Sequence, residues 1–496
     1  MENFTDNTEA DLNEILKIRR EKLENLKDSG RNPFAITYYD RKYTAREILD
    51  DFDALTEKEV SLAGRIMTKR VMGKASFAHI QDGMEQIQLY IRIDEIGEEA
   101  YTEFKKFDIG DIAGFTGLPF ITHMGEKSIR VKTITLLAKS LQPLPEKFHG
   151  LKDMDLRYRQ RYVDLIMNPE VKAAFITRAN MIAAIREYMT GLGYLEVDTP
   201  VLHNQATNAN ARPFETHHNT LNMDMFLRIE LELHLKRLIV GGIDRVFEIG
   251  KVFRNEGMDT RHNPEFTLME FYEAYADYNV MMTRAEEMYC YVADKVLGTR
   301  ELNYQGTKIS LERPWKRMTM AGSVKEYSGV DFDSFACDDM KAKEIAKEKN
   351  VHVEDHWNWG MILNAFFDEY VEKNLIQPTF IYEYPIEISP LAKRNAMKPY
   401  MTERFELFIA GSEAGNAFSE LNDPIDQKER FIAQAKSKFG EFDFTIDDDF
   451  INAIEIGMPP TGGMGIGIDR MVMLFTDSAS IRDVIFFPTM KSDING

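Results

Sequence analysis

The chain has 496 residues, 44% of them hydrophobic, so it is long enough for two or more domains, one with a large core. Its first thirty residues are rich in charge and no apolar run approaches 18 residues, which argues against a signal peptide, a membrane span or a membrane partner. We therefore expect a cytoplasmic protein. Two cysteines argue against a disulfide framework or a cysteine-rich zinc site. A net charge of -20 argues against a protein that coats nucleic acid, DNA included, non-specifically, but it does not exclude a specific RNA substrate.

The first predicted element is an amphipathic helix. Apolar residues recur at helical spacing from Leu12 to Leu26, and we expect the lysine and arginine side chains on the other side of this helix. From about Val60 to Leu141, short apolar runs are separated by glycines, and Ile87, Leu89 and Ile91 alternate with polar residues. This pattern predicts a small β-barrel.

The next segment contains the best candidate for a linker. Gln142 to Gly150 holds two prolines and a glycine, which favour a turn or an extended connection. Beyond it, Met181, Ile185 and Met189 share one face of a predicted helix that stops near Gly193. The remaining chain mixes long helices with strands and has no short repeat, so it predicts one large α+β domain.

The most informative segment runs from Arg245 to Tyr272. It predicts a strand, a long polar loop and a returning strand. On the returning strand, the two-residue period puts Phe266, Leu268, Glu270 and Tyr272 on one face. An aromatic ring, a carboxylate and a phenol on one surface suit a nucleotide base and an ammonium group. The alternative is a sheet face with a partly buried glutamate paired to an arginine.

A second strand-like segment, Gly415 to Leu421, repeats this mixture of aromatic and polar side chains on one face, and two glutamates precede it. Carboxylates near a phosphate-binding loop suit magnesium, which takes a few carboxylates and leaves positions for phosphate and water. Glutamates that simply face the solvent are the alternative. The residues concerned are Glu406, Glu413, Asn416, Phe418 and Glu420.

A third segment, Pro459 to Met471, gathers four glycines ahead of Arg470. Glycines at this density let the backbone approach a ligand closely. The spacing matches neither the dinucleotide fingerprint nor the phosphate loop that ends in Gly-Lys-Ser/Thr. Tight packing of a strand against a helix is the alternative explanation.

Together, these segments resemble class II aminoacyl-tRNA synthetases. Gly193 to Pro200 is similar to the first motif of that class, Phe253 to Glu256 with Arg261 to Phe266 is similar to the second, and Gly467 to Arg470 is similar to the third. Further segments are similar to bacterial-type lysyl-tRNA synthetases: PLPEKFHGL at 143–151, RYRQRYVDLI at 157–166, ARPFETHHN at 211–219 and FSELNDPIDQKERF at 418–431.

The resemblance implies an α+β fold with four parts. These are an N-terminal helical extension at 1–55, an oligonucleotide-binding-type (OB) β-barrel that binds the anticodon at 56–142, a linker at 143–155, and a class II catalytic domain at 156–496. The catalytic domain is expected to have a mostly antiparallel sheet flanked by helices. The first motif lies at a homodimer interface in this family, so a homodimer is expected.

The resemblance also implies a reaction and its residues. ATP would activate L-lysine to lysyl-adenylate with release of pyrophosphate, and the lysyl group would pass to the 3′ end of tRNA(Lys), with Arg254 and Arg470 catalytic. The residues implied for ATP are Arg254, Glu256, His262, Asn263, Phe266, Glu406, Glu413 and Arg470, of which Glu406 and Glu413 would hold Mg²⁺. Those implied for lysine are Asn208, Glu232, Arg254, Glu270, Tyr272, Asn416, Phe418 and Glu420. Those implied for the anticodon are Phe77, Gln88 and Glu126.

Two segments beside the amino-acid pocket depart from the family's usual form. Thr207 to Asn210 stands where many relatives carry a Gly-Gly pair. Glu230 to His234 replaces a pattern that has proline before Glu232 and tyrosine after it. These departures leave open a paralogue with shifted amino-acid specificity.

Three other functions are less consistent with the residues. Aspartyl and asparaginyl synthetases share the domain order but need a basic pocket where this chain has Glu270 and Glu420. A class I synthetase would carry a His-x-Gly-His signature and a Lys-Met-Ser-Lys-Ser loop, which are not present. A non-catalytic RNA-binding or signalling homologue would have no need of Arg254, Glu413 and Arg470.

Overall fold

The computed structural model describes residues 9–145, 153–205, 211–437 and 447–491. Their packing separates two compact units, Met1–Lys172 and Ala173–Gly496, each with hydrophobic core residues of its own. No helix within the described ranges is both long enough and apolar enough to cross a membrane. Asn208 and the rest of Thr207 to Asn210 lie outside the described residues, as does part of the expected linker.

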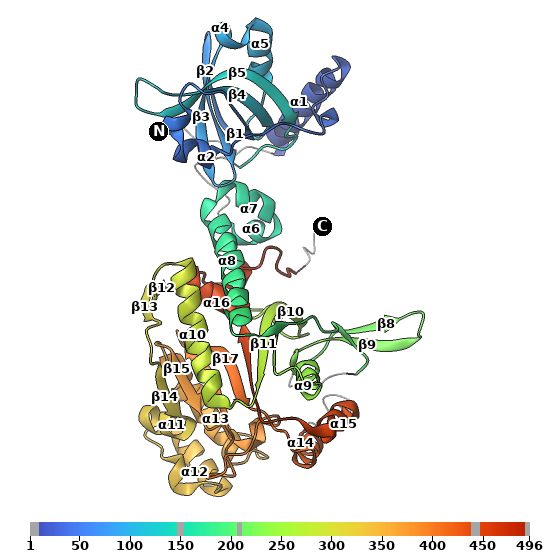
Figure 1. Ribbon diagram of the computed structural model, residues 1–496, viewed down its shortest axis with the longest axis vertical. Helices are drawn as coiled ribbons and strands as arrows, with labels where there is room; N and C mark the ends of the chain where they lie inside the picture. The colour runs from blue at the N-terminus through green and yellow to red at the C-terminus, as the bar shows by residue number, and fades with distance from the viewer. Residues whose placement is uncertain (1–8, 146–152, 206–210, 438–446, 492–496) are drawn as a thin grey trace. The chain divides into compact units, whose positions relative to one another are not determined.

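The first unit is built on a closed barrel of strands in the order β1-β2-β3-β5-β4, drawn in blue to teal in Figure 1. Its elements are α1 (Glu9–Asp28), η1 (Pro33–Ala35), α2 (Ala45–Asp50), α3 (Phe52–Leu55), β1 (Val60–Met72), β2 (Ala75–Asp82), β3 (Glu85–Arg92), α4 (Ile93–Ile96), α5 (Glu98–Lys106), β4 (Ile112–Ile121), β5 (Lys127–Ala138), α6 (Met154–Arg159) and α7 (Arg161–Met167). The alternating Ile87, Leu89 and Ile91 are all buried inside it. The predicted barrel is therefore confirmed.

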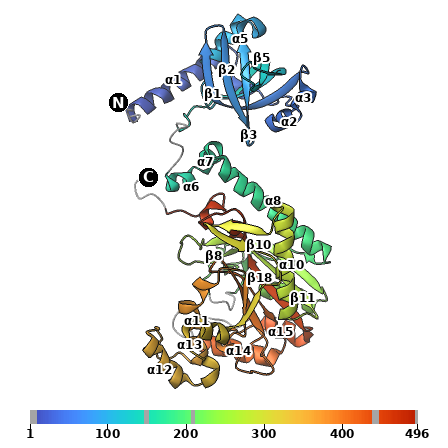
Figure 2. The same cartoon turned by 90° about the vertical axis from the view of Figure 1, so that its left-hand side faces the viewer.

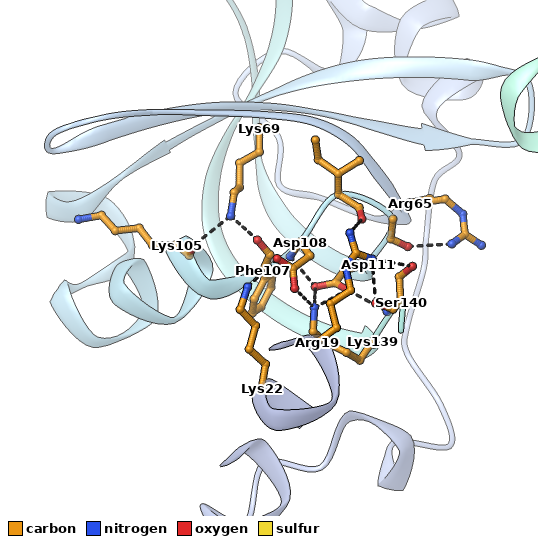
Figure 3. A network of polar contacts seen from close by, with 12 residues as sticks. Arg19, Lys22, Arg65, Lys69, Lys105, Phe107, Asp108, Asp111, Lys139 and Ser140 are labelled. Atoms are coloured by element: carbon orange, nitrogen blue, oxygen red, sulfur yellow. Dashed lines mark hydrogen bonds and ion pairs between the residues drawn. The ribbon is translucent and has the colours of Figure 1, made fainter. Parts of the chain in front are cut away.

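The N-terminal helix α1 is confirmed, but the expectation that its basic residues lie away from the packed side is wrong for Arg19. This side chain is 8% exposed and donates hydrogen bonds to the carbonyl oxygens of Ser140, Gln142 and Ile109 (Figure 3). Arg19 lies four residues after Ile15 and four before Leu23, so helical spacing places it within the apolar stripe. Burial is tolerated because backbone oxygens accept its donors.

The second unit contains an eight-stranded sheet in the order β14-β15-β16-β17-β18-β11-β10-β6. Neighbours are antiparallel from β15 through β10, and the outermost pairs β14·β15 and β10·β6 are parallel. Its strands are β6 (Leu195–Glu196), β10 (Arg245–Phe253), β11 (Glu265–Ala274), β14 (Lys316–Thr319), β15 (Thr379–Tyr382), β16 (Arg404–Ile409), β17 (Ser412–Ser419) and β18 (Thr461–Gly467). The mostly antiparallel catalytic-type sheet expected from the sequence is confirmed.

Helices cover one face of this sheet. Figures 1 and 2 both show α8 (Pro169–Gly191) beside α10 (Tyr278–Val296), and Tyr188 of α8 donates to Glu287 of α10 at 3.1 Å. Met269 and Phe271 of β11 face the core that these helices and α16 (Ile468–Phe475) complete. The two-residue period of β11 therefore turns Phe266, Leu268 and Glu270 toward the opposite face, as predicted.

The remaining elements of the second unit surround this sheet. They are β7 (Leu202–His203), β8 (Glu215–His218), β9 (Met223–Leu227), α9 (Glu232–Val240), β12 (Glu301–Tyr304), β13 (Thr307–Ser310), α11 (Met320–Ser328), η2 (Phe332–Phe335), α12 (Asp339–Lys349), α13 (Trp359–Tyr370), η3 (Glu372–Asn374), η4 (Ile386–Ile388), α14 (Pro424–Ser437), α15 (Asp448–Gly457) and η5 (Ile481–Asp483). Helices α9 and α15 contribute to the core cluster that contains Tyr272 of β11.

Candidate functional site

A cavity of about 520 Å³ lies on the face of the sheet turned away from α10, against β11, β16, β17 and β18. Most residues implied for ATP and lysine line it, although they come from distant parts of the chain. They are Glu232, Arg254, Glu256, His262, Asn263, Phe266, Glu270, Glu406, Glu413, Asn416, Phe418 and Arg470. Tyr272 and Glu420 are buried behind this lining, and Asn208 lies outside the described residues.

Arg254 follows directly after β10 and faces the cavity with most of its donors unused. Its backbone N–H donates to Pro264 O at 2.8 Å, and its Nε donates to Ile229 O at 3.3 Å. The guanidinium carbon lies 5.2 Å from the centre of the Phe266 ring. No carboxylate of the described residues forms an ion pair with it. The guanidinium is therefore available to an anionic ligand.

Arg470 lies in the first turn of α16 and borders the same cavity. Its Nη1 donates to the backbone oxygen of Glu413 at 2.9 Å and is 3.5 Å from Oε2 of that residue. Its Nη2 is 3.2 Å from Nε2 of His262, whose other ring nitrogen contacts Asp259 at 2.8 Å. The glycine-rich segment, Pro459 to Met471, and the polar loop that contains His262 thus meet at the Arg470 guanidinium. Two arginines in one cavity suit a ligand with several negative charges.

The acidic end of the cavity contains Glu270, which is 6% exposed. Its carboxylate accepts from the Tyr272 hydroxyl at 2.9 Å and from the Leu231 N–H at 3.1 Å. Burial and the nearby Glu232 raise the pKa of Glu270 to about 7, against the effect of these two hydrogen bonds. A buried carboxylate with a raised pKa is stabilised by a cation, so this end suits an ammonium group.

Lys236 is an important residue that sequence reasoning missed. Its fully buried ammonium pairs with Glu232 at 2.5 Å and also with Glu420, and it lies 5.3 Å from the Phe418 ring centre. Both carboxylates raise the pKa of Lys236, although burial opposes them. The four-residue spacing of Glu232 and Lys236 on α9 is a signal for the first pair. The second pair joins segments far apart in the sequence.

Glycines of β18 make room for this end of the cavity. A side chain at Gly463 would overlap the Glu420 carboxylate and the Tyr272 ring. At Gly465, by contrast, an added carbon would lie 3.6 Å from Cγ of Glu270, an ordinary contact distance. The glycine-rich segment therefore allows the close approach of the protein's own side chains. Its approach to a ligand stays a prediction.

Glu406 and Glu413 lie on the neighbouring strands β16 and β17 and face the cavity. Glu406 accepts from the Tyr384 hydroxyl at 3.0 Å and pairs with Arg404 at 2.6 Å. Burial is the main cause that raises the pKa of Glu406 to about 7, and Glu413 adds to it while Arg404 opposes it. Two carboxylates that repel each other in a cavity are a donor set that fits Mg²⁺.

Arg404 is a second residue that sequence reasoning missed. Besides Glu406, it donates to the side-chain oxygen of Asn416 at 3.0 Å. It also lies over the Tyr384 ring, with its guanidinium carbon 4.6 Å from the ring centre. Arg404 thus contacts both Glu406, which is implied for magnesium, and Asn416, which is implied for lysine. The contact with Glu406 follows from the two-residue period of β16, whereas the contact with Asn416 emerges only when β16 and β17 pair.

The residues implied for the anticodon gather on the barrel of the first unit. Gln88 donates to Glu126 at 2.6 Å, and His79 contacts the other oxygen of Glu126 at 3.1 Å. Phe77 is only partly buried and stacks on Tyr90 of the neighbouring strand, with ring centres 4.9 Å apart. Phe77 is not among the buried residues of the barrel core.

The aromatic surface of the barrel extends beyond the implied residues. Tyr90 also contacts Phe120, at 5.8 Å between ring centres, and Arg130 lies 5.0 Å from the Phe120 ring centre. Sequence reasoning missed these three residues, although the cross-strand pair of Phe77 and Tyr90 follows from the barrel register. Partly exposed rings next to a guanidinium are typical of surfaces that stack single-stranded bases.

Comparisons with known proteins agree with this geometry. Residues 153–491 match the family described as tRNA synthetases class II (D, K and N), and residues 60–137 match the OB-fold nucleic acid binding domain. The chain is 58% identical to a lysine-tRNA ligase of Thermoanaerobacter sp. (strain X514), with 99% of this chain and 98% of the relative covered. Lysine-tRNA ligases of Clostridium acetobutylicum and Shouchella clausii are 56% and 52% identical, with at least 95% of each chain covered.

Proposed function

This chain belongs to the class II tRNA synthetases and is a lysine-tRNA ligase that uses ATP, and we propose which of its residues carry the reaction. The ligase joins lysine to tRNA(Lys) in two steps. The lysine carboxylate first attacks the α-phosphate of ATP and displaces pyrophosphate. A terminal hydroxyl of the tRNA then attacks the lysyl carbonyl and AMP leaves.

Arg254 is the residue on which the activation step depends most. The step brings two anions together, and a guanidinium placed between them lowers their repulsion and stabilises the charge that develops. Arg254 binds the lysine carboxylate and the α-phosphate. The observation that carries this assignment is that Arg254 lines the cavity without a carboxylate partner among the described residues.

ATP lies between Phe266 and Arg470, which flank the adenine ring. Their positions on β11 and at the start of α16, both against the cavity, support this assignment. His262, Asn263 and Glu256 of the polar loop contact the nucleotide. Glu406 and Glu413 would hold Mg²⁺, which neutralises phosphate charge when bound.

Lysine selection uses the acidic end of the cavity. Glu232 faces the α-ammonium group of lysine, and Glu420, with Glu270 and Tyr272, faces the ammonium group at the end of its side chain. Glu232 and Glu420 also pair with Lys236. Asn416 and Phe418 shape the pocket, with Asn416 held by Arg404. A site built for an ammonium group rejects uncharged side chains strongly, because its carboxylates would be left unpaired. Ornithine, one methylene shorter, is the natural competitor.

Recognition of tRNA and assembly involve other surfaces. The anticodon stacks on Phe77 and contacts Gln88 and Glu126 on the barrel. A homodimer forms through the first motif, Gly193 to Pro200; β6 within it is an edge strand of the sheet, and Leu195 is 51% exposed. We place the reaction in the cytoplasm, where tRNA is charged.

The test is exchange of labelled pyrophosphate into ATP, which reports activation without tRNA. Lysine, ornithine, aspartate and asparagine are compared in parallel, and we expect lysine to support the fastest exchange. Silence with lysine together with a signal from another amino acid would falsify the assignment. Arg254→Ala should lower lysine-dependent exchange by about 100-fold or more, because it removes charge stabilisation in the transition state. Near-normal exchange by a folded variant would remove Arg254 from the mechanism.

A further inference from the structure

Glu230 is a carboxylate in the cavity that the proposed roles do not use. It immediately precedes Leu231 at the start of α9 and lines the same cavity as Arg254 and Glu270. Within the described ranges, its side chain makes no hydrogen bond and no ion pair. A partly buried carboxylate without a partner costs free energy. Its presence is explained if a ligand supplies the missing positive charge.

The backbone on the two sides of Glu230 contacts Arg254 and Glu270. In the proposed function, Arg254 binds the carboxylate of the substrate lysine and Glu270 faces an ammonium group. The Ile229 carbonyl accepts from Nε of Arg254 at 3.3 Å. The Leu231 N–H donates to Oε1 of Glu270 at 3.1 Å, a contact that a proline at this position would not make. Glu230 therefore lies between the guanidinium assigned to the substrate carboxylate and a carboxylate that faces an ammonium group.

The neighbouring carboxylates already have partners within the protein. Glu232 and Glu420 both pair with the ammonium of Lys236. Glu270 accepts hydrogen bonds from the Tyr272 hydroxyl and from the backbone. Glu230 is thus a carboxyl group in this cluster that has no hydrogen-bond or ion-pair partner among the described side chains.

The electrostatics around Glu230 agree with this geometry. Burial, followed by Glu232 and Glu270, raises the pKa of Glu230 to about 8, whereas Arg254 and Lys236 act in the opposite direction. These groups face Glu230 from α9, from β11 and from the loop after β10. An ammonium group bound beside Glu230 would favour its ionised form and release its proton.

We propose that Glu230 determines specificity by binding the substrate ammonium group next to the carboxylate that Arg254 holds, so that the site requires a free protonated amine at that end. This inference rests on the proposed activation of lysine, whose α-ammonium group occupies that position. The second ammonium group of lysine, at the end of its side chain, remains for Glu270 and Tyr272. Glu230 thereby selects for substrates with a free α-amine, while Glu270 and Tyr272 select for the lysine side chain.

The first test compares lysine with 6-aminohexanoic acid, which lacks only the α-amine, in wild type, Glu230→Ala and Glu230→Gln. Lysine binding is measured by calorimetry, and 6-aminohexanoic acid is measured as an inhibitor of lysine-dependent exchange. We expect Glu230→Ala to raise the Kd for lysine about 10- to 100-fold, the range for hydrogen bonds to charged groups, with a smaller rise for Glu230→Gln. Inhibition by 6-aminohexanoic acid should change less than about twofold, because it cannot use this contact.

The second test measures protons released when lysine binds at pH 7, from calorimetry in two buffers of different ionisation enthalpy. Wild type should release more protons than Glu230→Gln, because only the wild-type carboxyl group loses a proton to accommodate the ammonium. A merely structural role for Glu230 would not produce this difference. Glu326→Gln, which removes the same charge from the exposed side of α11, is the matched control and should behave as wild type.

An unchanged lysine Kd in folded Glu230→Ala would overturn the inference. So would an equal loss of affinity for lysine and for 6-aminohexanoic acid, or equal proton release by wild type and Glu230→Gln. Removing Glu230 relieves repulsion from Glu232 and Glu270, so we expect this variant to fold and to melt at a higher temperature at pH 8. Failure of the proposed function would show in the wild-type protein, as no exchange with lysine. Failure of the inference would leave exchange by the wild-type protein intact and would show only when the Glu230 variants are compared with wild type in lysine Kd, inhibition by 6-aminohexanoic acid and proton release.

Discussion

At the residue scale, the cavity concentrates carboxylates that change charge near neutral pH. Burial raises the pKa of Glu270 and that of Glu406 to about 7, from an ordinary value of 4.5. Each ionised carboxylate therefore destabilises the ligand-free fold. Bound cations would reverse this cost, which is why such groups gather where ligands bind. These carboxylates therefore lower the stability of the ligand-free protein and raise its affinity for cationic ligands.

The pH dependence of stability follows from Glu406. Its pKa is raised in the folded protein, so the stability it contributes is full below pH 4.5 and is lost as the pH rises through about 7. In the absence of Mg²⁺, the unfolding free energy of wild type should fall relative to Glu406→Gln between these values, by up to about 1.4 kcal/mol per pH unit. Urea denaturation at pH 5, 6, 7 and 8 measures this difference. Parallel curves for the two proteins would contradict the assignment.

At the element scale, β18 shows how a glycine-rich strand supports both faces of the sheet. Met464 and Ile466 point into the core beneath α10, whereas Gly463 and Gly465 alternate with them on the cavity side. Larger residues on the cavity side would displace the side chains of β11 and β17. The density of glycine in this strand therefore has a packing cause as well as a functional one.

Gly463→Ala tests this role against a matched variant of the same strand. The added methyl group meets Glu420 and Tyr272, so we expect a loss of about 1 to 3 kcal/mol in unfolding free energy, typical of overpacking, and a higher KM for lysine. Gly465→Ala places its methyl group at ordinary contact distance and should retain more stability. The measurements are urea denaturation and lysine-dependent exchange. Equal losses from the two variants would show that strand flexibility, rather than contact with Glu420 and Tyr272, explains the glycines.

At the scale of the whole molecule, the sites proposed for amino-acid activation and for the anticodon fall in two different units. Each has its own core, and the residues implied for amino-acid activation all lie in Ala173–Gly496. The aromatic surface of Phe77, Tyr90 and Phe120 belongs to the barrel of the other unit. Changes on the barrel should therefore affect the tRNA-dependent step alone.

Phe77→Ala tests this separation. Loss of one stacked base costs about 1 to 3 kcal/mol, so the KM for tRNA in lysine attachment should rise by about 5- to 150-fold. Exchange of pyrophosphate into ATP, which needs no tRNA, should keep its wild-type rate. Phe77→Tyr retains an aromatic ring and serves as the control. A comparable loss of exchange in Phe77→Ala would mean that the barrel also acts on the first step.

The sequence alone was sufficient to predict the barrel from local periods and the family from ordered motifs. The mostly antiparallel sheet was an expectation that the family resemblance implied. The two-residue period of β11 correctly predicted that Phe266 and Glu270 lie on one face. Assignments that rest on the family resemblance, such as magnesium at Glu406 and Glu413, remain predictions. Local patterns are informative here because the side-chain direction of a strand depends on the strand itself.

Only the tertiary structure decided which distant groups meet. The pairing of Lys236 with Glu420, the close approach of Gly463 to Tyr272, and the lack of a partner for Glu230 among the described residues depend on how separate segments pack. Arg19 is a further case, since its burial requires carbonyl groups that the barrel supplies. The cost of a buried charge is set by its neighbours in space, so no pattern within one segment determines it.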